Sequence, residues 1–109
     1  MISLKDFEKI NIRTGTIVQV DDFIKARKPA YQLRIDFGDL GIKHSSAQIT
    51  DHYKKDELIG QQIIAVVNFF PKQIANFYSE CLVLGVYDEN NHVILLQPER
   101  KVTNGQQIG

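Results

Sequence analysis

The stretch of sequence that decides the fold lies close to the N-terminus and is Ile12-Arg13-Thr14-Gly15-Thr16-Ile17-Val18-Gln19-Val20. Side chains in a β-strand alternate between two faces, so every second residue of this stretch shares a face. One predicted face carries Ile12, Thr14, Thr16, Val18 and Val20, and the other carries Arg13, Gly15, Ile17 and Gln19. A glycine in the middle of a strand usually marks a bend or a bulge, and small barrels use such a bend to turn a corner.

The rest of the chain adds short strands separated by turns, together with two short helices. Further strands are predicted at residues 31–37, 42–49, 61–69, 81–87 and 93–96, with helices over residues 3–10 and 50–58. Residues 72–78 are expected to form a loop, and residues 99–109 a polar tail. Five or six short strands with a helix after the third favour an all-β OB-fold, a five-stranded Greek-key barrel, in a single domain covering residues 1–109. An SH3-like barrel is the alternative, but it has no helix at that place.

Composition and charge narrow the classes of function. The chain has 109 residues, 43% of them hydrophobic, and 13 basic residues balance 13 acidic ones. This composition is typical of a globular domain and argues against attraction to nucleic acid through bulk charge alone. Cys81 is the one cysteine, so it can form neither an internal disulfide nor a thiolate cluster, and we expect it in the core.

Motifs for catalysis, cofactors and membranes are missing from the sequence. His44, His52 and His92 lack metal-ligand spacing, and no nucleophile motif or glycine-rich phosphate loop occurs. We therefore expect no enzyme activity, no catalytic residues, no cofactor and no metal. The longest apolar stretches are far too short to span a bilayer, and the N-terminus lacks the apolar core of a signal peptide. The sequence predicts a cytoplasmic protein without a membrane span.

A group of polar and apolar residues is expected to gather at one end of the barrel. This predicted surface for peptide or RNA consists of Lys43, Ser45, Ser46, Asn68, Phe69, Phe70, Lys72, Phe77, Ser79 and Glu80. Phe69 and Phe70 are adjacent, so at most one of them can enter the core and the other is available to a ligand. The alternative is that Phe69 and Phe77 belong to the core and that the polar residues form its rim.

A second candidate surface is basic and lies between the first two predicted strands. It holds Lys25, Arg27 and Lys28, in a loop that OB domains often use for ligands. A short run of charges is also common on a surface that only meets solvent.

Several segments together resemble one known family, the tRNA-binding OB domain, which occurs alone and appended to methionyl- and phenylalanyl-tRNA synthetases. They are Ile12-Arg13-Thr14-Gly15-Thr16-Ile17-Val18, Lys43-His44-Ser45-Ser46-Ala47-Gln48-Ile49-Thr50, Ala65-Val66-Val67-Asn68-Phe69 and Ser79-Glu80-Cys81-Leu82-Val83-Leu84-Gly85. The Ser-Ser-Ala-Gln-Ile-Thr and Asn-Phe-x-Pro stretches resemble its stand-alone secretion-chaperone branch, the CsaA proteins, more closely.

This resemblance implies a homodimer with chaperone activity toward unfolded or pre-secretory proteins and an ancestral affinity for tRNA. It leaves open whether a protein-translocation motor is a partner. The chain departs from the tRNA-binding pattern at Ser45-Ser46-Ala47, where the family has Ser-Gly-Ile, and at Ile74, where a basic residue is usual. It departs again at Ser79-Glu80-Cys81-Leu82, where the family has Ser-x-Gly-Met. Loss of a glycine and of a cation argues against tight tRNA binding.

The two ends of the chain carry the prediction of a dimer. Leu4, Phe7 and Ile10 form an apolar stripe on a helix too short to be stable without a partner surface. The stripe can cover the open end of the barrel in the same subunit. Alternatively, as the resemblance to a dimeric family suggests, it packs with residues 98–109 across a two-fold axis.

Overall fold

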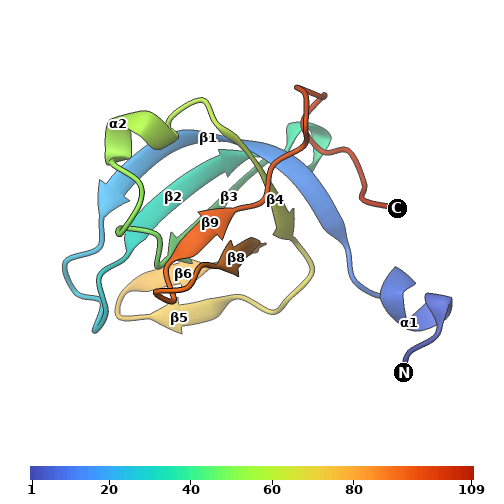
Figure 1. The fold of residues 1–109 in the computed structure, drawn as a ribbon, viewed down its shortest axis with the longest axis horizontal. Helices are drawn as coiled ribbons and strands as arrows, with labels where there is room; N and C mark the ends of the chain where they lie inside the picture. The colour runs from blue at the N-terminus through green and yellow to red at the C-terminus, as the bar shows by residue number, and fades with distance from the viewer.

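A five-stranded sheet, curled into a nearly closed barrel, forms the body of the protein (Figure 1). The computed structural model describes residues 1–109, and the order of its strands is β3-β2-β1-β4-β7. The barrel elements are β1 (Ile12–Asp22), β2 (Tyr31–Asp36), β3 (Ile42–Ala47), β4 (Gln62–Val66) and β7 (Leu82–Val83). The remaining elements are α1 (Leu4–Glu8), the 3-10 turn η1 (Gly38–Leu40), α2 (Lys55–Leu58), β5 (Lys72–Ile74), β6 (Phe77–Ser79), β8 (Gly85–Tyr87) and β9 (Val93–Leu95). The expected all-β OB-type fold is confirmed. None of the helices has the length and apolar character needed to cross a bilayer.

The long strand β1 is the centre of the sheet and contains a bulge. Its first half pairs with β4 and its second half with β2, and the register with β2 shifts between Ile17 and Gln19. Val18 is therefore the extra residue of the bulge and is exposed, whereas Ile17 is fully buried. The predicted strict alternation along 12–20 is thus wrong beyond Ile17, and the bulge lies three residues after Gly15.

Gly15 has a different role from the expected bend, because it lets two core side chains lie directly on β1. A Cβ atom at this position would come within 2.7 Å of Ile35 Cγ2 and 2.8 Å of the Phe37 ring. Both neighbours are fully buried. Distances this short exclude a side chain, so the glycine is required by packing.

The core fills the barrel and is closed at one end by α2. Its members are Ile17, Val20, Tyr31, Leu33, Ile35, Phe37, Ala47, Ile49, Leu58, Ile63, Ala65 and Cys81. Cys81 is buried, as expected, and burial raises the pKa of its thiol to about 12. The helix begins at Lys55 with Lys54 as its N-cap, later than the predicted start at Thr50 or Asp51.

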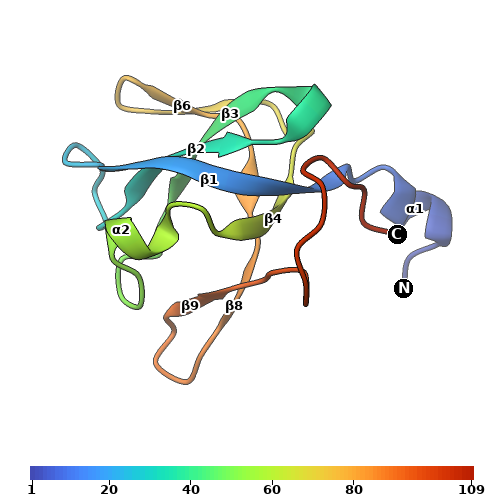
Figure 2. The same cartoon turned by 90° about the horizontal axis from the view of Figure 1, so that it is seen from above.

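Two segments differ from the sequence-based expectation in their secondary structure. Residues 72–78, expected to form a loop, belong to a hairpin of β5 and β6, in which Ile74 pairs with Phe77. Its two-residue turn holds Ala75 at φ 53°, a conformation usually taken by glycine or asparagine, so an alanine at this position does not indicate a tight turn. The predicted strand 81–87 divides into β7, which stays in the barrel, and β8, which pairs with β9 (Figure 2).

The C-terminal segment lies on the barrel of its own chain and is not a free tail. The amide of Thr14 donates to Gln106 O at 3.0 Å, and the amide of Ile108 donates to Ile12 O at 3.0 Å. Residues 102–108 thus cover the edge of β1 that β2 leaves open. The segment is therefore part of the fold of its own chain, and a contact across a two-fold axis stays a prediction.

Candidate binding surface

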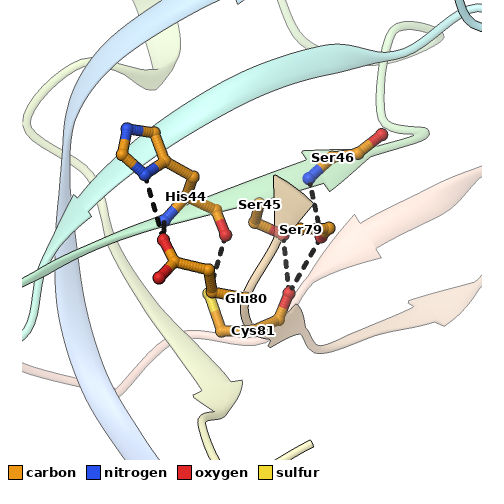
Figure 3. A network of polar contacts seen from close by, with 6 residues as sticks. All are labelled: His44, Ser45, Ser46, Ser79, Glu80 and Cys81. Atoms are coloured by element: carbon orange, nitrogen blue, oxygen red, sulfur yellow. Dashed lines mark hydrogen bonds and ion pairs between the residues drawn. The ribbon is translucent and has the colours of Figure 1, made fainter. Parts of the chain in front are cut away.

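The polar residues predicted on the third strand form the seam that closes the barrel (Figure 3). The Ser45 hydroxyl donates to the Cys81 carbonyl at 2.9 Å, and the amide of Ser46 donates to Ser79 Oγ at 3.0 Å. A backbone bond from the Glu80 amide to His44 O at 2.8 Å runs between the same segments. Side chains therefore replace part of the regular ladder between β3 and β7.

Glu80 and His44 make the most polar contact of this seam. One carboxylate oxygen, Glu80 Oε1, accepts from the His44 amide at 2.9 Å and lies 3.0 Å from His44 Nδ1. Burial by itself would raise the pKa of Glu80, but the bonds from His44 and the nearby charge of Lys43 outweigh it and lower that pKa. Glu80 is thus an ionised group already engaged by its own chain.

Several predicted contact residues are consequently engaged in the fold itself. Ser45 was expected to face a ligand, but it is only 1% exposed and its hydroxyl is used inside the seam. The Asn68 side chain accepts from the Asn11 amide at 2.9 Å and donates to Lys9 O at 2.8 Å, which fixes the linker between α1 and β1. Both side chains are predicted on the ligand surface because a sequence pattern does not distinguish a polar residue that bonds within the fold from one that contacts a ligand. We call the pair of Asn68 bonds that fixes the linker the Asn68 clamp.

The aromatic residues divide into a half-buried anchor and an exposed edge. Phe77 is half-buried and packs edge-to-face on Phe23, with ring centroids 5.3 Å apart, so it holds the β5–β6 hairpin against the barrel. Phe69 is 57% exposed, Phe70 97% and Tyr78 56%. We call these three residues the aromatic edge. The expectation that at least one of Phe69 and Phe70 is on the surface is confirmed. Tyr78 is not among the predicted contact residues, although its neighbours Phe77 and Ser79 are.

Basic side chains flank this edge. Lys72 is exposed on β5 and pairs across the hairpin with Ser79, while Lys43 is partly exposed next to the seam. The loop between β1 and β2 presents Lys25, Arg27 and Lys28 to solvent, and none of the three forms an ion pair.

The contact between Phe23 and Phe77 connects the basic loop with the hairpin. Both views of the ribbon show the β1–β2 loop beside the β5–β6 hairpin (Figures 1 and 2). The fold therefore places the basic loop next to the β5–β6 hairpin, although the two segments are far apart in the sequence.

Comparison with known proteins identifies the family. Residues 12–107 match the family described as "Putative tRNA binding domain". The chain belongs to this tRNA-binding domain family. The matched residues extend from the start of β1 to the segment that covers it, so they include the barrel, the basic loop and the aromatic edge.

Two solved structures are similar to this chain over their full length. A crystal structure of chaperone CsaA from Bacillus anthracis strain Ames is 51% identical with a TM-score of 0.95, covering 100% of this chain and 99% of the other. A crystal structure of the CsaA chaperone protein from Picrophilus torridus is 58% identical with a TM-score of 0.94, covering 100% of both chains. The resemblance to the CsaA branch that the sequence indicated is confirmed.

The curated relatives are much longer than this chain. A methionine–tRNA ligase from Methanococcoides burtonii is 32% identical over 105 residues, which are 96% of this chain and 15% of the ligase. The chain therefore spans about one seventh of the length of the ligase, and the similarity does not extend to the rest of the ligase. This family is described by binding and not by a reaction, and the absence of enzyme activity stays a prediction.

Proposed function

We propose that this protein is a molecular chaperone that binds extended apolar segments of unfolded or pre-secretory polypeptides. The observation that carries the proposal is the aromatic edge, above all Phe70, which is 97% exposed. Large apolar side chains on a surface leave hydrophobic area in water, and covering that area drives association. The similarity to two proteins described as CsaA chaperones supports the same function.

The backbone next to the aromatic edge supports binding of an extended chain. Strand β5 pairs only with β6, so its outer edge has no partner strand. A peptide can add to such an edge through main-chain hydrogen bonds, which do not depend on sequence. Phe69 and Phe70 precede this strand and would contact apolar side chains of the bound peptide. Backbone pairing with apolar contacts suits a protein with many different clients.

An aggregation assay tests this function. An unfolded client is diluted into buffer with wild-type protein, with Phe70→Ser, or with Ile59→Ser as the matched control. Ile59 is also an exposed apolar residue, but it follows α2 and lies outside the aromatic edge. We expect wild type and Ile59→Ser to suppress light scattering and Phe70→Ser to lose most of this effect. Failure of the wild type at several-fold excess over client would refute the chaperone function.

Binding of tRNA is the second candidate function, and the family match favours it. Lys25, Arg27 and Lys28 provide three free cations that can hold phosphates, and the adjacent β5–β6 hairpin carries the exposed ring of Tyr78, on which a base can stack. Binding should weaken steeply with salt, and replacing all three by Ala should reduce the log–log slope by about 2–3. Absence of any tRNA shift at low salt would exclude this candidate, and a tRNA that displaces a bound apolar peptide would show a shared surface.

The proposed chaperone acts as a cytoplasmic homodimer on export clients, with a translocation motor as the receiving partner. Leu4 and Ile10 are exposed and Phe7 is half-buried, and together with Ile108 they line an open groove between α1 and the C-terminal segment. A second copy covering this groove would place two aromatic edges in a fixed relation and increase avidity for a long chain. Light scattering should give a mass twice the 12.5 kDa of the monomer. The variant Phe7→Asp should have the mass of the monomer.

A further inference from the structure

Two histidines and an aspartate meet at the β8–β9 end of the barrel, outside the surface described above. His52 lies between β3 and α2, whereas Asp88 and His92 flank the turn that joins β8 to β9. One ligand atom from each of the three side chains lies within 4.8 Å of the other two. His52 Nε2 is 2.7 Å from Asp88 Oδ2, and the two imidazole rings lie 5.4 Å apart at an angle of 73°.

The turn holds Asp88 and His92 in place before any ligand arrives. Asp88 Oδ1 accepts the amides of Asn90 and His92, both at 2.9 Å, and so leaves Oδ2 directed at His52. The backbone is closed by a bond from the Asp88 amide to His92 O at 2.8 Å. Bonds of this kind orient a ligating carboxylate and raise the affinity of a metal site.

His52 is held in place through its neighbour Tyr53. The Tyr53 carbonyl accepts from the Tyr31 hydroxyl at 2.8 Å, and the Tyr53 hydroxyl accepts from the Leu95 amide at 3.0 Å. These bonds tie the segment before α2 to β2 and to β9. The distance between His52 and the β8–β9 hairpin is therefore set by the barrel and not by a mobile loop.

The chemistry of the three groups selects the ion. Two imidazoles with one carboxylate suit Zn²⁺, Co²⁺ or Ni²⁺, whereas Mg²⁺ and Ca²⁺ prefer oxygen ligands only. Ligand atoms around tetrahedral zinc lie about 3.3 Å apart, so the His52–Asp88 pair needs to open by less than about 1 Å. Asp51 adds a second carboxylate, 3.6 Å from His92 Nε2, that compensates the charge of a cation.

We propose that His52, Asp88 and His92 form a binding site for a divalent transition-metal ion of the zinc type. The side chains of His52 and His92 are each 38% exposed, so an ion can enter from solvent. The bound ion would connect the segment before α2 to the β8–β9 hairpin. This hairpin is a two-stranded sheet that does not pair with the five-stranded sheet. The ion would therefore add a cross-link at a place where no strand pairing holds the hairpin.

Titration with Zn²⁺ in the presence of excess Mg²⁺, followed by NMR of the histidine rings, tests the site. The chain has three histidines, and His44 lies at the seam, so it serves as an internal control. We expect the ring signals of His52 and His92 to move together to a 1:1 end point while His44 stays unchanged. His52→Ala should weaken the affinity at least about tenfold, and His44→Gln should leave it unchanged.

A stability readout is independent of the NMR signals. At a hundredfold excess of Zn²⁺ over its Kd, the Tm should rise by on the order of 10 °C. The amides of β8 and β9 should also exchange more slowly. The proposal is overturned if no ring signal moves at about 1 mM Zn²⁺, if all three histidines shift alike, or if His52→Ala binds as the wild type does.

Discussion

Replacing Gly15 by alanine tests the packing that gives β1 its central position. The added Cβ would lie 2.7 Å from Ile35 Cγ2 and 2.8 Å from two atoms of the Phe37 ring. Nonpolar carbon atoms in contact normally lie about 3.5–4.0 Å apart. The new methyl group therefore forces a displacement of nearly 1 Å between β1 and two fully buried side chains.

The expected change in the free energy of unfolding follows from two opposing contributions. Overpacking of a core typically destabilises a protein by about 1–3 kcal/mol. Loss of glycine freedom in the unfolded chain stabilises by about 0.4–1 kcal/mol. We expect the free energy of unfolding to fall by about 1–2 kcal/mol, which lowers the Tm by about 5–15 °C.

Urea unfolding of a double-mutant cycle measures the effect. The variants are Gly15→Ala, Phe37→Leu and the double variant, with Gly109→Ala as a control because a Cβ there meets nothing within 4 Å. Leucine lacks the outer ring atom that the new Cβ would meet. The loss of unfolding free energy in the double variant should therefore be smaller than the sum of the losses in the two single variants by at least about 0.5 kcal/mol. A Gly15→Ala protein as stable as the wild type, or strict additivity in the cycle, would refute the packing argument.

Three further predictions concern the seam and the ends of the chain. The pKa of Glu80 is lowered from 4.5, so the stability that its carboxylate contributes is present above pH 4.5 and is lost as the pH falls through the lowered pKa. In urea unfolding, the free energies of unfolding of wild type and Glu80→Gln should therefore converge in acid. The Cys81 thiol, with a pKa of about 12, should resist alkylation at pH 8 and react at once in urea; rapid labelling of the folded protein would contradict its burial. Asn68→Ala should remove two hydrogen bonds worth about 0.5–1.5 kcal/mol each and speed hydrogen exchange of the Asn11 amide, and an unchanged rate would argue against the clamp.

The barrel could be predicted because its signals are local. The alternation in residues 12–17 reflects burial of one face of a strand, and the apolar run of β4 reflects burial of both faces. The helix after the third strand is also indicated by local sequence. The bulge at Val18 could not be found in this way. It arises where β1 changes partner from β4 to β2, and that change depends on the tertiary structure and not on the sequence of β1.

The candidate site was only partly predictable for a similar reason. At least one of Phe69 and Phe70 is expected on the surface because adjacent residues of a strand face opposite sides, and this argument needs no tertiary information. Both are exposed, because β4 ends at Val66 and the two residues lie in the segment that follows it. Ser45 and Ser79 look like ligand-facing residues in sequence, yet each forms a hydrogen bond across the seam, Ser45 with the Cys81 carbonyl and Ser79 with the Ser46 amide. His52 and His92 are forty residues apart, so no local spacing indicated that they meet.

The pairing of residues 102–108 with β1 has a consequence for the order of events during synthesis. About 90 residues separate the two partners in sequence, so Ile12 and Thr14 leave the ribosome long before the segment that covers them. During that interval β1 exposes an unpaired edge, which other nascent chains can join. Covering of this edge is therefore a late event, and a chain whose synthesis stalls after β9 would keep the β1 edge open and be prone to aggregation.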